Sequence, residues 1–279
     1  MRSCPSAAGG TCFLLTPHET GLSGEGADVD QYALRPAGGA RGRLLVFLNG
    51  SGGSPEGGAR GVQDSWYGVA RAEGLHVLGV SYRSGAAVGA LCRGNDACFE
   101  PTRVTQLTGV FQPGAASELR DVVTDEGIEV RLASALRVLA ERDPDGGWSD
   151  FVETDGGVQW ARLFVSGHSQ GGGHAALLGK RHAVERVLML ASPCDALTDG
   201  TPASWLRDSM GWATAPATQF FGLWSQGDQT CPAAPANWQR MGLPEAARDS
   251  VALQCAGETE HGAPLACTNN GERWKVMFR

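Results

Sequence analysis

The sequence predicts an α/β fold in which a mostly parallel β-sheet carries helices on both faces. Short continuous apolar runs, typical of strands that are buried on both faces, recur along the chain. Segments with the apolar periodicity of helices lie between them. Glycine-rich connectors separate the two kinds of segment. Alternation of this kind is the pattern of a parallel sheet covered by crossover helices.

The predicted elements follow one another along a single domain that spans residues 1–279. Residues 43–50, RLLVFLNG, form an apolar run that ends in small and polar residues, and residues 75–82, LHVLGVSY, form a second such run. The longest helical pattern covers residues 117–144 and stops at Pro144. The other expected elements are strands at 29–36, 161–167, 184–193 and 218–228, helices at 64–74 and 172–183, a cysteine-stapled loop at 83–104 and a small cap or binding loop at 196–217.

Composition and charge argue against nucleic acid and membranes as partners of this chain. The chain has 30 acidic and 23 basic residues, a net charge of −7, which disfavours nucleic acid because phosphate binding needs clustered lysine and arginine. No apolar run approaches the roughly 20 residues of a transmembrane helix. We expect a monomer without a membrane span. The opening MRSCPSAAGGTC lacks the apolar segment of a signal peptide, so an exported protein would begin here at its mature end.

Eight cysteines, an even number, favour disulfides over free buried thiols. Disulfides indicate an oxidising compartment, so we expect a secreted or periplasmic protein. No CxxC pair or Cys/His cluster has zinc-like spacing, and no metal site is expected. Two pairs flank loop-like segments and two are matched by proximity in sequence: Cys92–Cys98 and Cys255–Cys267, then Cys4–Cys12 and Cys194–Cys231.

The segment LFVSGHSQGGGHAALLGK, residues 163–180, places Ser169 between a predicted strand and a predicted helix. Gly167 and Gly171 lie two residues before and two after it, where the lack of a Cβ allows a very tight turn. In this GxSxG pattern the serine is forced into a strained conformation with its hydroxyl exposed. We therefore predict that Ser169 is a nucleophile. The competing interpretation is an ordinary glycine-rich surface loop.

A nucleophilic serine needs a base that takes its proton and an acid that orients the base. His174 and His182 lie on the helix that leaves Ser169 and are too close in sequence to turn back towards it. His261 follows the remaining strands, in the loop ETEHGAP, and is the predicted base.

The acid is predicted from its position after a strand. Asp228 in QGD and Asp195 in SPCD each follow a predicted strand, where catalytic groups of parallel sheets gather. Asp228 is preferred because it lies one strand closer to the segment of His261, and Asp195 is the alternative. Glu258 and Glu260 are weaker candidates.

The negative oxygen that forms during acyl transfer needs two hydrogen-bond donors. One is predicted to be the backbone N–H of Gln170. The other is expected in the glycine-rich loop after the strand 43–50, with Ser51 as first choice and Gly50 and Gly52 as alternatives.

Tryptophans in the expected cap are candidates for substrate binding. Trp205 and Trp212 would suit an apolar or aromatic acyl group, including polymeric esters, whereas Trp224 within its strand is expected to be core.

Four segments together resemble the α/β-hydrolase superfamily. They are GHSQGGG at 167–173, LNGSGG at 48–53, QGD at 226–228 and EHG at 260–262. Within it, the chain is similar to exported bacterial serine esterases of the cutinase-like and dienelactone-hydrolase-like groups. The resemblance implies a mostly parallel sheet of about eight strands and ester hydrolysis by a Ser-His-Asp triad without cofactor or metal. The alternatives are an inactive hydrolase-fold binding protein, a peptidase or amidase that uses the same triad, and a cysteine-dependent redox or metal protein.

Overall fold

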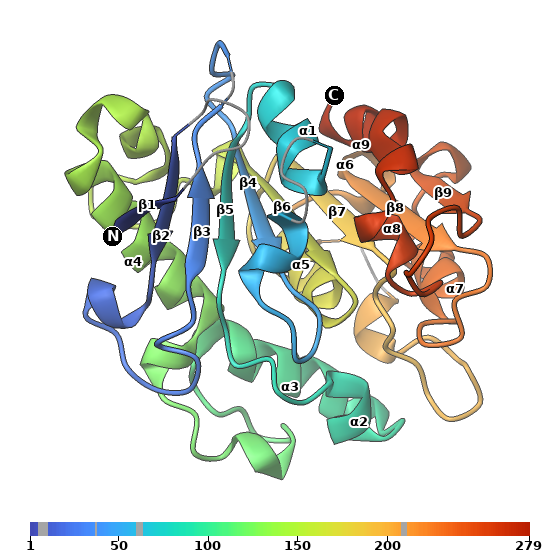
Figure 1. Ribbon diagram of the computed structural model, residues 1–279. Coiled ribbons are helices and arrows are strands. Elements are labelled where there is room, and N and C mark those ends of the chain that lie inside the picture. Colours follow the sequence, from blue (N-terminus) through green and yellow to red (C-terminus); the bar gives the residue numbers. More distant parts are fainter. Residues whose placement is uncertain (5–10, 37, 60–63, 208–210) are drawn as a thin grey trace.

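The computed structural model describes residues 1–4, 11–36, 38–59, 64–207 and 211–279. The strands within these ranges are β1 (Arg2–Cys4), β2 (Cys12–Leu15), β3 (Gln31–Leu34), β4 (Leu44–Leu48), β5 (His76–Val80), β6 (Leu163–His168), β7 (Arg186–Leu190), β8 (Phe220–Ser225) and β9 (Arg248–Val251). They form one sheet in the order β1-β2-β3-β5-β4-β6-β7-β8-β9 (Figure 1). The pairs from β1 to β5 are antiparallel, and those from β5 to β9 are parallel. The predicted mostly parallel sheet is confirmed, with nine described strands in place of about eight.

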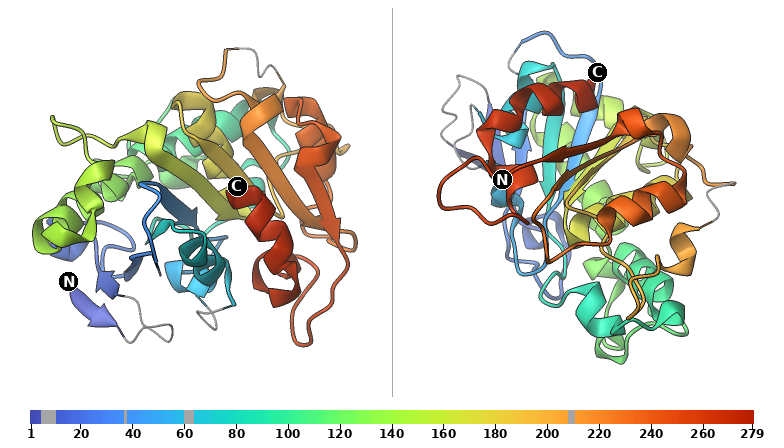
Figure 2. Two further views of the ribbon diagram at one scale, coloured as in Figure 1. Left: turned by 90° about the horizontal axis from the view of Figure 1, so that it is seen from above. Right: turned by 90° about the vertical axis from the view of Figure 1, so that its right-hand side faces the viewer.

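Helices cover both faces of this sheet, as Figures 1 and 2 show. Helices α3, α4, α5 and α7 contribute side chains to the apolar core on one face, whereas α1 and α9 contribute to the core on the other face. The α-helices in the described ranges are α1 (Trp66–Ala72), α2 (Val88–Cys92), α3 (Asp96–Thr108), α4 (Ile128–Arg142), α5 (Gln170–Arg181), α6 (Pro216–Gln219), α7 (Ala234–Met241), α8 (Ala263–Ala266) and α9 (Gly271–Phe278).

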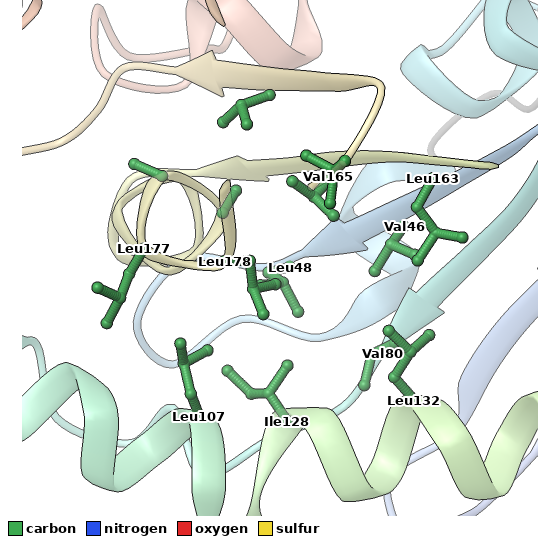
Figure 3. Close-up of a cluster of buried hydrophobic side chains, with 14 of the residues drawn as sticks. Val46, Leu48, Val80, Leu107, Ile128, Leu132, Leu163, Val165, Leu177 and Leu178 are labelled. Atoms are coloured by element: carbon green, nitrogen blue, oxygen red, sulfur yellow. The ribbon is translucent and has the colours of Figure 1, made fainter. Parts of the chain in front are cut away.

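Strand β4 shows why the central strands are continuously apolar. Its alternate residues point to opposite faces, and both faces are covered, so every side chain of the strand is fully buried. Leu44, Val46 and Leu48 belong to one core, and Leu45 and Phe47 to the other. Figure 3 shows the first of these cores, where β4 and β6 meet side chains from α3, α4 and α5: Val46, Leu48, Leu163, Val165, Leu107, Ile128, Leu132, Leu177 and Leu178.

The expected loop at 83–104 is wrong, because helix α2 and most of α3 occupy it. The side chain of Asn95 accepts a hydrogen bond from Ala97 N and caps α3, which ends at Gly109 in the left-handed conformation. The disulfide between Cys92 and Cys98 joins the two helices. This disulfide, which was expected to close a loop, therefore links two helices.

The expected helix at 117–144 is too long at its start, because α4 begins only at Ile128. Short 3-10 turns at Ser117–Leu119 and Thr124–Glu126 precede it. Gly127 packs against the end of α3, and a Cβ at this position would lie 2.6 Å from the carbonyl carbon of Thr108. The chain therefore approaches α3 in an extended conformation at Gly127 and becomes helical afterwards.

All eight cysteines are paired, and all four predicted disulfides are confirmed: Cys4–Cys12, Cys92–Cys98, Cys194–Cys231 and Cys255–Cys267. Strands β1, β2 and β9 and helices α7, α8 and α9 were not predicted as elements. None of the helices in the described ranges combines the length and the apolar character needed to cross a membrane.

Candidate active site

Ser169 lies at the turn between β6 and α5 with φ 54° and ψ −121°. A serine with positive φ is strained by about 1–3 kcal/mol, and the surrounding structure must hold it in place. Its N–H donates to the carbonyl oxygen of Leu190 in β7 at 2.9 Å, and its own carbonyl accepts from Gly172 N at 3.1 Å. The strained turn predicted from the GxSxG pattern is therefore present in the backbone.

The glycines around Ser169 are required by close packing. A Cβ on Gly167 would overlap the backbone of Gly171, and a Cβ on Gly171 would overlap the carbonyl oxygen of Leu48 in β4. Gly172 is equally constrained, because a Cβ there would overlap Oγ of Ser192. The strand, the turn and the helix can approach one another only because these positions carry no side chain.

Asp228 and His261 form a hydrogen-bonded pair. Asp228 is fully buried in the loop after β8, and its Oδ2 accepts from His261 Nδ1 at 2.8 Å. Its other oxygen, Oδ1, accepts from the backbone N–H of Thr230 at 2.8 Å and of Cys231 at 3.1 Å. Since a carboxylate only accepts, His261 carries its proton on Nδ1 when neutral, and its Nε2 is left as an acceptor.

Asp195 has a different set of partners. Its carboxylate forms a two-pronged ion pair with Arg103 of α3, at 2.6 Å from Nε and 2.5 Å from Nη2, and both side chains are 1% exposed. Trp205 Nε1 donates to the same carboxylate at 2.8 Å. The structure thus brings Asp228 to His261 and holds Asp195 in a buried ion pair instead.

Ser169 and His261 line one cavity of about 980 Å³. The Ser169 hydroxyl donates no hydrogen bond to any residue in the described ranges. Such contacts between a nucleophile and its base often form fully only when substrate is bound. Across the described part of the chain, no three His, Cys, Asp or Glu side chains gather as ligands for a metal ion.

The loop after β4 forms the wall of the cavity next to Ser169. Asn49 Nδ2 shapes this loop by donating to the carbonyl oxygens of Gly50 at 2.8 Å and Gly53 at 2.9 Å. A Cβ on Gly50 would lie 3.2 Å from that of Ser169, so the loop closely approaches the serine. Asn49 was not predicted as a site residue, although its place directly before the glycine-rich loop was a usable signal.

The candidate oxyanion donors differ in availability. The backbone N–H groups of Ser51 and Gln170 donate no hydrogen bond to another described residue, whereas Gly52 N donates to the Ser84 carbonyl at 2.8 Å. The hydroxyl of Ser51 donates to Gln170 Oε1 at 2.8 Å, so the two residues are in contact. The N–H of Gly50, the other alternative, also donates to no described residue, so the donors left for an oxyanion, which needs two, are those of Gly50, Ser51 and Gln170.

The geometry does not place the two cap tryptophans at the cavity. Trp205 and Trp212 are 4% and 9% exposed, and their rings stack with centroids 6.3 Å apart. They belong to the core that also contains α3 and α5, and neither is among the residues that line the cavity of Ser169. Of the expected cap at 196–217, residues 208–210 lie outside the described residues.

Two disulfides tether the loops that carry Asp228 and His261. Cys194–Cys231 joins the loop after β7 to the loop of Asp228. Cys255–Cys267 closes the segment that contains His261. Both side chains of the pair are therefore carried by covalently tethered loops.

The sequence matches no family model and no curated protein. Solved structures show a likeness in fold. An S-formylglutathione hydrolase from Agrobacterium tumefaciens superposes with a TM-score of 0.54 at 12% identity, over 99% of each chain. TT1662 from Thermus thermophilus has a TM-score of 0.49 at 15% identity, over 100% of this chain and 98% of the other. EstE1, a thermostable carboxylesterase cloned from a metagenomic library, has a TM-score of 0.46 at 14% identity, over 100% and 89%.

At these identities the likeness concerns the fold alone, and the superposition on the Agrobacterium enzyme carries it. It extends over the nine-stranded sheet and the elements around it. The chain therefore has the α/β-hydrolase fold.

Proposed function

We propose that the protein is a serine hydrolase that cleaves carboxylic esters with the triad Ser169, His261 and Asp228. The observation that carries the proposal is the 2.8 Å bond from His261 Nδ1 to the buried Asp228, at the cavity that Ser169 lines from a strained turn. Serine, imidazole and carboxylate in these roles are the requirements for nucleophilic acyl transfer.

The reaction proceeds through an acyl-enzyme. His261 Nε2 takes the proton of Ser169 as the hydroxyl oxygen attacks the ester carbonyl, and the N–H groups of Ser51 and Gln170 stabilise the oxyanion. The protonated His261 then gives its proton to the departing alcohol. Water, activated by the same imidazole, hydrolyses the acyl-enzyme. Asp228 keeps the imidazole in the Nδ1–H tautomer and stabilises its positive charge.

The wall of the cavity supports an apolar acyl group. Val29, Ala59 and Leu265 contribute apolar side chains to the cavity that Ser169 lines. Apolar pockets with a few placed polar groups are the usual form of small-molecule sites. The structure that shares the fold with a TM-score of 0.54 is named an S-formylglutathione hydrolase, which supports hydrolysis as the class of reaction. Four disulfides support an oxidising compartment, secreted or periplasmic.

The first test compares wild type with Ser169→Ala on p-nitrophenyl esters of graded chain length. We expect the substitution to lower kcat by about 10⁴-fold or more, because it removes the nucleophile. Ser54→Ala is the matched control, since Ser54 lines the same cavity outside the triad and should leave kcat unchanged.

Full ester hydrolysis by Ser169→Ala would refute the proposal. A fluorophosphonate probe adds an independent measurement, because it labels a serine only where the serine is activated. A wild type that neither hydrolyses esters nor is labelled would favour the inactive binding protein.

A further inference from the structure

His168, the residue before Ser169, contacts the backbone of His261. Its Nε2 lies 2.8 Å from the carbonyl oxygen of His261, although the two residues are 93 positions apart in sequence. The two rings lie with centroids 4.8 Å apart at an angle of 52°. The end of β6 is therefore bonded directly to the loop that carries the candidate base.

The partner determines the tautomer of His168. A carbonyl oxygen only accepts hydrogen bonds, so Nε2 of His168 must carry the proton and donate it. Burial, followed by the charge that His261 acquires on protonation, lowers the pKa of His168 to about 4. His168 is therefore neutral at neutral pH, and it adds no second positive charge when His261 takes a proton from the serine.

The segment of His261 needs such a tether. Residues 252–262 contain no helix or strand, and the Cys255–Cys267 disulfide links this segment to the residue that follows helix α8. Glu260 accepts a hydrogen bond from Ser225 Oγ, and the His261 side chain is bonded to Asp228. The bond from His168 adds the backbone of His261 itself to these contacts and connects it to the residue next to the nucleophile.

We propose that His168 is a positioning residue for His261, which by donating its Nε2–H to the His261 carbonyl holds the base within reach of Ser169. This inference rests on the proposed function. His168 takes no proton from substrate. Its effect is on the geometry of proton transfer, where displacements of about 1 Å cost up to about 100-fold in rate.

The test replaces His168 by Gln, Asn and Phe and measures kcat and KM on p-nitrophenyl butyrate. The amide nitrogen of Gln reaches the position of Nε2, whereas that of Asn is too short and Phe has no donor. We expect Phe and Asn to lower kcat about 10- to 100-fold with KM unchanged, and Gln to restore most of kcat. His182→Phe is the matched control, since His182 is a hydrogen-bonded histidine that pairs with Glu129 away from the cavity.

A second measurement uses the wild type and does not depend on the folding of a variant. A two-bond ¹H–¹⁵N correlation spectrum distinguishes the ring tautomers, and we expect His168 to be the Nε2–H form at pH 7. An Nδ1–H tautomer would overturn the inference. So would an active wild type in which His168→Phe keeps full kcat, or in which Gln is as slow as Phe. A wild type without ester hydrolysis would instead overturn the proposed function, and the role of His168 in it, even with the Nε2–H tautomer present.

Discussion

The loops after β7 and β8 each present a buried aspartate at the same edge of the sheet, yet the two carboxylates have different partners. Asp195, after β7, is 1% exposed and pairs with Arg103. Asp228, after β8, is 0% exposed and bonds His261. A buried carboxylate must be paired or hydrogen-bonded, and both of these are. The comparison teaches that the partner decides the role of such a residue.

The two partners differ in what they can do with a proton. The guanidinium of an arginine stays protonated at all ordinary pH values, so the pair of Asp195 with Arg103 is static. The ion pair also contacts the turn at Ser169, because Arg103 Nη1 donates to the carbonyl oxygen of Gln170 at 3.1 Å. An imidazole can both accept and donate a proton, so the pair of Asp228 with His261 can support proton transfer. The Cys194–Cys231 disulfide holds the two loops together.

The largest expected effect is that of Asp228→Asn. Oδ1 of Asp228 accepts from two backbone N–H groups, so the amide of the substituted asparagine will point its NH₂ towards His261. His261 must then accept at Nδ1 and carry its proton on Nε2, where it can no longer take the proton of Ser169. We expect kcat to fall about 10⁴-fold, measured on p-nitrophenyl esters, with little change in unfolding free energy. A kcat near that of wild type would remove Asp228 from the triad.

The next effect, that of Asp195→Asn, is expected in stability. It leaves the buried charge of Arg103 without its counter-charge, which costs about 3–5 kcal/mol in unfolding free energy, measured by urea denaturation. The kcat of the folded fraction should fall far less than in Asp228→Asn. The double substitution Arg103→Met with Asp195→Leu is the control, because it removes both charges and should recover much of the loss.

If Asp195→Asn instead lost kcat while its free energy of unfolding stayed unchanged, the roles of Asp195 and Asp228 would be exchanged. That result would assign the catalytic acid to Asp195, the alternative that its position after a strand left open.

A loss of stability of similar size is expected from removing the covalent link between the two loops. Replacing Cys194 and Cys231 by alanine opens a loop of 37 residues. From the entropy that loop closure removes from the unfolded chain, we expect the free energy of unfolding to fall by about 4 kcal/mol. Removing Cys92 and Cys98, separated by 6 residues and joining α2 to α3, is the matched control at about 2 kcal/mol.

The two cysteine pairs should differ in activity as well. We expect kcat to fall in the Cys194/Cys231 variant, because Cys231 N donates to Asp228, and to stay unchanged in the control. Equal kcat values in both variants would show that the disulfide does not hold Asp228 in place.

Much of the sheet was predictable because its signals are local. The central parallel strands are apolar on both faces and appear as short apolar runs in the sequence, within a few residues of their bounds. The region 83–127 was predicted wrongly, as a loop at 83–104 and as the start of a long helix from 117, because the ends of α3 and α4 depend on packing between distant residues. The start of α4 at Ile128, for example, is set by Gly127, which is extended where it packs against the end of α3.

In the candidate site, too, the features formed by neighbouring residues were predictable, whereas those formed by distant residues were not. Ser169 with its glycines is a continuous segment, and steric exclusion around a tight turn allows few other residue types there. The pairing of Asp228 with His261 was one of two open choices, and the tertiary structure brings these side chains together. His168 bonds a residue 93 positions further along the chain, and Asn49 shapes the loop that directly follows it. Neither contact appears in the apolar periodicity of the sequence.

The sequence by itself determined the α/β alternation, the strained turn at Ser169 and the short disulfides Cys92–Cys98 and Cys255–Cys267, because each depends on residues close to one another in the chain. Only the tertiary structure decided which aspartate meets His261, that Trp205 and Trp212 are packed in the core, and that His168 bonds the loop of the base. The physical reason is that a buried polar group must find a partner, and the partners available to it are set by which distant segments the sheet brings side by side.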